Sequence, residues 1–204
     1  MEAFADAVFA IAFTLPVVHI VLPESAGEGR DLGRDLVALW PSYLGYALAS
    51  FVIGLFWVHH HFSGAIYRTT GHWFLIATVI FLAAVGFIAF PARAFAEHIS
   101  DPSAREIASQ YLVIGLTSLS LTWLMKWTVG LRRGQVDSRL DPAYVRRLDR
   151  TYWWLGMLSA LAAVMVFVRW EVGLALSIAV TLYYLRPPET PEYSTESPIV
   201  EGES

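Results

Sequence analysis

MEAFADAVFAIAFTLPVVHIVLPE, residues 1–24, is apolar for almost its whole length. It nevertheless contains four residues that fit such a run poorly: Asp6, Thr14, Pro16 and His19. A helix needs about 20 consecutive apolar residues to cross a bilayer, so residues 4–23 are predicted to form a membrane-spanning helix. An ionisable side chain inside such a helix is costly unless it is paired. The carboxylate at position 6 therefore requires a partner.

The composition of the whole chain agrees with a membrane protein. Of its 204 residues, 56% are hydrophobic and 16% are charged, and the mean hydropathy is +0.51. A soluble domain has about 25% charged residues. There is no cysteine, which excludes disulfides, iron–sulfur clusters and thiolate metal sites. The net charge of −4 gives no indication of a nucleic-acid partner.

Further apolar stretches of spanning length follow at residues 38–61, 73–90 and 107–130. Pro91 is predicted to end the third of these helices. The stretch 152–186 is too long for one span, and Arg169-Trp170-Glu171 within it predicts a tight hairpin between a fifth and a sixth helix. The sequence thus predicts an all-α, polytopic membrane protein with six transmembrane helices in one domain, residues 1–186.

The orientation follows from the basic residues. The segment between the fourth and fifth helices contains six of the fourteen Lys and Arg residues: Arg132, Arg133, Arg139, Arg146, Arg147 and Arg150. Loops rich in Lys and Arg stay in the cytoplasm, so with six spans both termini are expected there, in a multi-pass protein of the cell membrane. Residues 187–204 are acidic and contain proline, which predicts a disordered cytoplasmic tail.

This topology places Asp6 at the same depth as the end of the second helix, where the sequence is WVHHH, residues 57–61. A tryptophan or histidine N–H can donate to the carboxylate. The amino end of a helix also favours an anion. Structural pairing requires fewer assumptions than a proton relay, but both interpretations stay open.

The three consecutive histidines do not predict a metal or haem site. Neighbouring residues on a helix point about 100° apart, so one ion cannot bind all of them. The sequence also shows no Ser-His-acid set, no paired carboxylates and no glycine-rich phosphate loop in a plausible cluster. We therefore expect no enzymatic activity, no bound metal and no cofactor.

Helical spacing divides the first helix into two faces. Ile11, Leu15 and Val18 lie on one stripe, which Phe4 and Ala7 extend towards the cytoplasm. Asp6 is five residues before Ile11, about 140° around the helix. A stripe of this kind is found in ordinary helix packing more often than in a pore.

Three motifs resemble the transmembrane protein 175 family of potassium channels. The start of that family's first helix has the motif R-x-x-x-F-S-D, and it resembles residues 2–15, EAFADAVFAIAFTL. Residues 4–6 stand at F-S-D, with Ala5 in place of serine. The position of the arginine would precede Met1. SFVIGLFWVHHH matches the family's tryptophan followed three residues later by histidine, here Trp57 and His60. GFIAFP resembles the end of its third helix.

The resemblance implies a homotetramer in which four copies of the first helix surround a pore that conducts potassium, or cations with weak selectivity. In bacterial members three rings of bulky aliphatic residues form the constriction, spaced as Ile11, Leu15 and Val18 are here. Thr14, about 60° from the centre of the stripe, would lie at the pore edge or hydrogen-bond to its own backbone. The motif residues would form a structural network of Phe4, Asp6, Trp57 and His60.

A constriction of this type gates by dewetting of apolar rings, and the sequence contains no T-V-G-Y-G filter. The expected partners are other copies of the chain, membrane lipid and potassium ions. Two other functions stay open: a six-helix membrane haem or redox protein that uses the histidines, and a proton-coupled transporter that uses Asp6 and His60.

Overall fold

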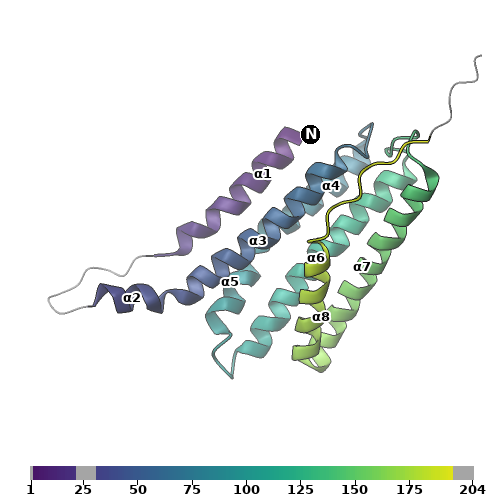
Figure 1. Ribbon diagram of the computed structural model, residues 1–204. Helices are drawn as coiled ribbons and strands as arrows, with labels where there is room; N and C mark the ends of the chain where they lie inside the picture. The colour runs from purple at the N-terminus through teal and green to yellow at the C-terminus, as the bar shows by residue number, and fades with distance from the viewer. Residues whose placement is uncertain (1, 22–30, 195–204) are drawn as a thin grey trace, which may run out of the picture.

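The computed structural model describes residues 2–21 and 31–194, and these residues are helical apart from loops and two isolated β-bridges (Figure 1). The elements in chain order are α1 (Glu2–Thr14), the 3₁₀-helix η1 (Leu15–His19), α2 (Leu32–Ala38), α3 (Trp40–Ser63), α4 (His72–Phe87), α5 (Ala89–His98), α6 (Arg105–Arg132), α7 (Pro142–Val168) and α8 (Trp170–Tyr183). The predicted all-α fold is confirmed for these residues. The end of the first predicted span, residues 22 and 23, lies outside them.

Several helices have the length and composition of membrane spans. Within the described residues, four stretches qualify: Trp40–Ser63, His72–His98, Arg105–Arg132 and Pro142–Val168. Two shorter apolar helices are Ala3–His19 and Trp170–Tyr183. A protein with several membrane-spanning helices is confirmed, while the count of six spans stays a prediction.

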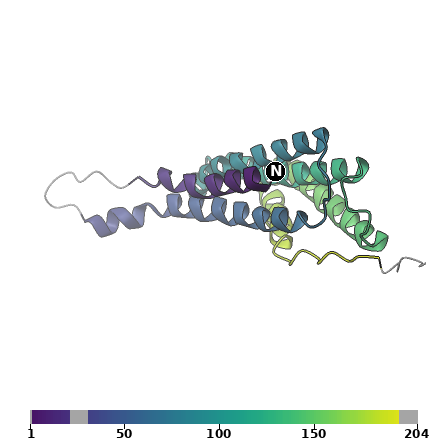
Figure 2. The same cartoon turned by 90° about the horizontal axis from the view of Figure 1, so that it is seen from above.

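The long helices lie side by side, with α6 in the middle of the bundle (Figures 1 and 2). α6 packs against α4, α5, α7 and α8, and its apolar segment is the most buried of the four. α1 packs against α3 and α4 at one side of the bundle, away from α7 and α8. One side of α1 is therefore left uncovered by the part of the chain that the structure describes.

Aromatic rings fill the centre of the bundle. Trp123 of α6 lies 5.3 Å from Phe81, 5.8 Å from Tyr152 and 6.4 Å from Phe56, measured between ring centroids. Aromatic pairs at these separations are worth about 0.5–1.5 kcal/mol beyond their buried area. This cluster holds α3, α4, α6 and α7 together.

The predicted hairpin after the fifth helix is present. α7 ends at Val168, and α8 begins at Trp170 after the extended residue Arg169. α8 can fold back closely because position 173 is glycine: a Cβ there would lie 2.6 Å from the Cβ of Val166.

Pro91 does not end the third span, as the sequence predicted. The helix only breaks at Ile88 and continues as α5 to His98. Pro91 is the third residue of α5, in the first turn, where a missing N–H breaks no hydrogen bond within the helix. The backbone N–H of Ala92 then donates to the carbonyl of Ile88 at 3.1 Å, which carries the helical path across the break.

α7 begins at residue 142, well before the apolar stretch predicted from residue 152. Its start has an ordinary cap: the Asp141 side chain accepts hydrogen bonds from the N–H groups of Ala143 (2.6 Å) and Tyr144 (3.2 Å), and Pro142 occupies the first turn. Three arginines of the predicted loop, at positions 146, 147 and 150, therefore lie on a helix.

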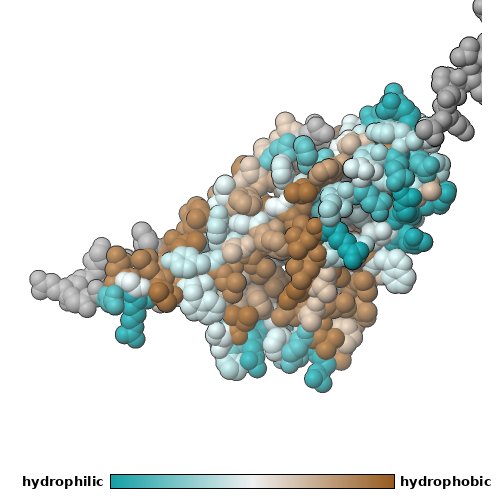
Figure 3. All heavy atoms as spheres, viewed as in Figure 1, coloured by the Kyte–Doolittle hydropathy of each residue, from teal (hydrophilic) through white to brown (hydrophobic). Residues whose placement is uncertain are grey.

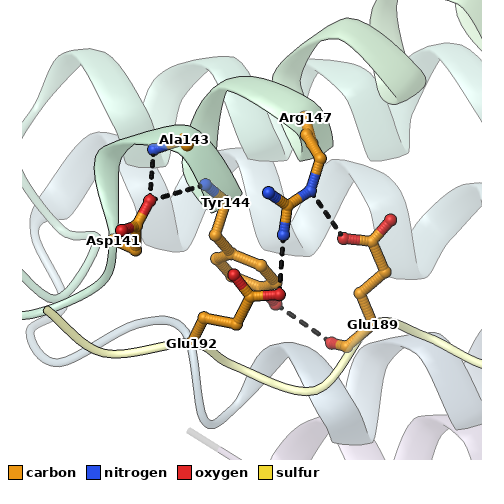
Figure 4. A network of polar contacts seen from close by, with 6 residues as sticks. All are labelled: Asp141, Ala143, Tyr144, Arg147, Glu189 and Glu192. Atoms are coloured by element: carbon orange, nitrogen blue, oxygen red, sulfur yellow. Dashed lines mark hydrogen bonds and ion pairs between the residues drawn. The ribbon is translucent and has the colours of Figure 1, made fainter.

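Residues 187–194, the first part of the tail predicted to be disordered, have a defined path along the start of α7 (Figure 4). The carbonyl of Glu192 accepts from the N–H of Asp141 at 2.8 Å, and that of Glu189 accepts from the Tyr144 hydroxyl at 3.0 Å. Arg147 pairs with Glu192 at 2.7 Å and with Glu189 at 3.5 Å. Residues 195–204 lie outside the described part of the chain, and a domain boundary at residue 187 stays a prediction.

Candidate functional site

The inward face of α1 is formed by small and aromatic residues. Ala5 and Phe9 are 0% and 2% exposed, and Ala12 and Pro16 are also buried. The Phe9 ring lies 5.5 Å from the ring of His60 on α3 and 6.1 Å from that of Phe81 on α4. These contacts fix which side of α1 faces the bundle.

The opposite face carries the apolar stripe. Ile11 is 56% exposed, Leu15 57% and Val18 68%, and Phe4 at the amino end is 60% exposed. The described residues leave more than half of each of these four large apolar side chains uncovered. They are available to lipid or to other copies of the chain, and a pore-lining role for them stays a prediction.

The helix changes character within the stripe. α1 ends at Thr14, and residues 15–19 form the 3₁₀-helix η1, with Pro16 in its first turn. Residues three apart eclipse one another in a 3₁₀-helix, so Leu15 and Val18 point the same way. Ile11 and Leu15 are four positions apart at a rise of about 1.5 Å per residue, and Leu15 and Val18 are three apart at about 2.0 Å. Both separations along the axis are therefore about 6 Å. The three stripe residues are thus evenly spaced along the axis.

Thr14 is exposed, next to the stripe, and its hydroxyl bonds to its own helix. It donates to the carbonyl of Ala10 at 2.8 Å and lies 3.3 Å from that of Ile11. Such a bond to the preceding turn holds the hydroxyl hydrogen and leaves the oxygen lone pairs as acceptors.

Asp6 is paired with the tryptophan of α3. The Trp57 indole N–H donates to Asp6 Oδ1 at 3.1 Å, as the shared depth of the two residues predicted. The Trp57 ring also stacks on His61, with 5.6 Å between centroids. The contact joins the amino end of α1 to the last turns of α3.

His60 belongs to a second, deeper cluster. Its Nδ1 lies 3.0 Å from the ammonium of Lys126 on α6, which also donates to the Ser63 hydroxyl at 3.2 Å. Within the described residues, no hydrogen bond joins His60 to Asp6. The four motif residues of the sequence analysis therefore separate: Asp6 pairs with Trp57, His60 pairs with Lys126, and Phe4 is exposed.

Lys126 is the site residue that the sequence analysis missed. It is 1% exposed, and its Nζ lies 4.7 Å from the Trp123 ring centre and 5.4 Å from that of Tyr67. Among the described residues, no carboxylate pairs with it. A lysine inside a predicted span is itself a signal, but its hydrogen-bond partners, His60 and Ser63, are more than sixty residues away in the sequence.

The two clusters border the same cavity. It has a volume of about 470 Å³, and its lining includes Asp6, His60, His61, Ser63 and Lys126. The polar end of α1, the histidines of α3 and the lysine of α6 thus meet at one end of the bundle.

The three consecutive histidines point to three different partners. His59 Nε2 lies 2.7 Å from the carbonyl of Tyr184, His60 contacts Lys126, and His61 stacks on Trp57. No group of three His, Cys, Asp or Glu residues able to hold a metal ion occurs in the described residues. The three histidines therefore do not converge on one point.

Comparisons with known proteins agree with this architecture. The family model described as "Endosomal/lysosomal potassium channel TMEM175" matches residues 1–89, which include α1, α3 and α4. A potassium channel from Streptomyces collinus is 31% identical over 186 residues, 90% of this chain and 89% of that protein. A potassium channel from Chamaesiphon minutus is 39% identical over 117 residues, 57% of this chain and 58% of that protein.

A solved structure gives the same result for the fold. The crystal structure of a lysosomal potassium-selective channel TMEM175 homolog from Chamaesiphon minutus superposes with a TM-score of 0.72 at 26% identity, covering 92% of this chain and 96% of that one. The match extends over the second half of the chain as well as the first. The chain therefore belongs to the TMEM175 family.

Proposed function

We propose that four copies of this chain form a potassium channel in the cell membrane, with α1 and η1 of each copy around the central pore. The observation that carries the proposal is the uncovered stripe of Ile11, Leu15 and Val18 on a helix whose other face is packed into the bundle. The named relatives, which are potassium channels, support the choice of ion.

In this arrangement each stripe residue contributes four identical side chains to one ring. Three rings about 6 Å apart would make an apolar passage of about 12 Å. A narrow apolar ring cannot replace the hydration shell of an ion, so it blocks conduction when it is dry and permits conduction when it is wet. Thr14 lies beside the rings, and its hydroxyl oxygen would be the polar group closest to them.

The shorter helices complete the topology of the proposal. Ala3–His19 and Trp170–Tyr183 would span the membrane together with the four longer stretches. Six spans place both termini on the side of the arginine-rich segment, which the distribution of basic residues makes cytoplasmic.

The experiment is potassium flux from liposomes that contain purified protein, compared at equal tetramer content. Ile11→Asn and Leu15→Asn should wet the constriction, raise the resting leak and reduce discrimination between potassium and sodium. Ile178→Asn is the matched control, because this isoleucine is 44% exposed on α8, across the bundle from α1. It should leave the leak unchanged.

Two results would contradict the proposal. One is a monomeric mass by light scattering in a detergent that preserves the fold, because one copy of α1 cannot surround a pore. The other is a leak in Ile11→Asn and Leu15→Asn no larger than in the unmodified protein. Saturable flux driven by a pH gradient would instead identify a proton-coupled transporter.

A further inference from the structure

The arginines at the start of α7 differ in whether a carboxylate holds them. Arg147 pairs with Glu192 at 2.7 Å, and Arg139 pairs with Asp137 at 2.7 Å. Within residues 31–194 as described, Arg146 and Arg150 have no ion pair, and both side chains are exposed. Four residues separate them, so they lie one turn apart on the same side of α7.

These two arginines border an open hollow. It has a volume of about 610 Å³ and is lined by Ala143, Arg146, Arg147, Asp149 and Arg150. The single carboxylate of this lining, Asp149, already accepts a hydrogen bond from the Trp127 indole N–H of α6 at 2.8 Å. The hollow therefore presents an excess of positive charge.

The next turn of α7 marks the depth of the hollow in the membrane. Trp153 and Trp154 are 43% and 57% exposed, and they stand three and four positions after Arg150. Exposed tryptophans gather at the level of the lipid headgroups. Figure 3 shows hydrophobic residues over the middle of the bundle and hydrophilic ones at the end where α7 begins. In a membrane, this order would put the guanidinium groups at the height of the lipid phosphates.

The tail contacts one residue of this lining, Arg147. Figure 4 shows Arg147 between the carboxylates of Glu189 and Glu192, with the Tyr144 hydroxyl on the Glu189 carbonyl. The protein's own acidic groups therefore neutralise the arginine next to the tail. Among the described residues, Arg146 and Arg150 have no carboxylate partner.

We propose that Arg146 and Arg150 bind the headgroup phosphate of an anionic phospholipid in the cytoplasmic leaflet. A guanidinium can hold two phosphate oxygens at once, and two of them one turn apart can share one headgroup. The exposed indoles of Trp153 and Trp154 would lie against the glycerol and upper acyl region of the same lipid. The cytoplasmic leaflet is the one that carries anionic lipids.

The test is native mass spectrometry of the detergent-solubilised protein with an equimolar mixture of phosphatidylglycerol and phosphatidylcholine. The unmodified protein should bind phosphatidylglycerol preferentially, and the preference should fall as salt is raised. Arg146→Gln/Arg150→Gln should weaken phosphatidylglycerol binding by on the order of tenfold or more, since each basic residue near an anionic surface contributes about fivefold. Arg146→Lys/Arg150→Lys should retain most of the preference.

Arg93→Gln/Arg139→Gln is the matched control, because it removes the same charge from arginines already paired with Glu97 and Asp137. It should bind phosphatidylglycerol within about twofold of the unmodified protein. Equal loss in both double variants would reduce the effect to net charge and overturn the proposal. The proposal would also be overturned if glycerol 3-phosphate or inorganic phosphate competed for the site as well as the lipid does. The same holds if the unmodified protein showed no salt-dependent preference for phosphatidylglycerol.

Discussion

Truncation of Phe9 should mainly lower the stability of this protein and truncation of Ile11 should mainly raise its leak, although the residues lie two positions apart on α1. Phe9 is 2% exposed and packs on His60 and Phe81. Removing a buried phenylalanine side chain costs about 3–5 kcal/mol. Because lipid is as apolar as the protein interior, only the packing part of that cost applies, and we expect about 3 kcal/mol for Phe9→Ala.

The corresponding cost at Ile11 is smaller. This residue is 56% exposed, so less than half of its side chain packs against the chain. A fully buried Ile→Ala change costs about 2–5 kcal/mol, and the covered part of Ile11 accounts for about 1–2 kcal/mol. In the proposed tetramer, however, Ile11→Ala would remove three carbons from each of four side chains in the first apolar ring. The resting potassium leak should therefore rise.

The assay combines two measurements on each variant. Thermal unfolding in detergent should show a melting temperature roughly 6–12 °C lower for Phe9→Ala and a smaller change for Ile11→Ala. Potassium flux per tetramer in liposomes should be normal for the surviving Phe9→Ala protein and raised for Ile11→Ala. If Ile11→Ala is the more destabilised variant and its leak is normal, the stripe is a packing surface and the proposed pore is wrong.

Three other variants test the surroundings of α1. Asp6→Ala should cost about 1 kcal/mol and lower the tetramer yield seen by light scattering, with unchanged ion preference. Trp57→Phe, which removes the indole N–H together with part of the ring, should lower the yield at least as much, whereas a well-assembled Asp6→Ala tetramer with altered selectivity would place Asp6 in the pore. Lys126→Met should have a melting temperature within a few degrees of the unmodified protein, since an apolar residue of similar volume can replace a buried charge. Lys126→Ala should lower the free energy of unfolding by about 2–4 kcal/mol through the cavity that it leaves. Equal melting temperatures for the two variants would contradict this. Hydrogen bonds from Arg139 lower the pKa of Asp137 to about 2, so this contact stabilises the protein fully above pH 4 and is lost as the pH falls towards 2. The melting temperature of Asp137→Asn should therefore lie below that of the unmodified protein at pH 7 and approach it near pH 2. A difference in melting temperature that does not change with pH would refute the assignment.

The parts of the fold that follow from local patterns could be predicted from the sequence. The spacing of Ile11, Leu15 and Val18 grouped these residues on one face of the first helix, because helical periodicity depends only on the helix itself; that this face is uncovered is visible only in the structure. The pairing of Asp6 with Trp57 followed from topology, because antiparallel spans bring the start of one helix to the depth of the end of the next. Both conclusions needed only the position of each residue along its own helix.

The errors arose where tertiary contacts or capping override hydropathy. Pro91 is a helix breaker in an interior but is harmless in a first turn, and a break at Ile88 puts it there. The start of α7 is polar, so a hydropathy scan passes over it, although Asp141-Pro142 is a capping signal. His60 was grouped with Asp6, whereas its partner in the structure is Lys126 of α6. Which helices lie next to α6 cannot be read from the hydropathy of one span.

The rotation of α1 about its axis is determined by two contacts of different kinds. Phe9 packs against the rings of His60 and Phe81, and Asp6 accepts a hydrogen bond from the Trp57 indole N–H. The two residues are three apart, about 60° around the helix, so a turn of α1 in either direction would lose at least one of the contacts. His60 is in turn held by Lys126 of the central helix α6. The direction of the apolar stripe, and with it the geometry of the proposed pore, therefore depends on residues that lie outside the stripe itself.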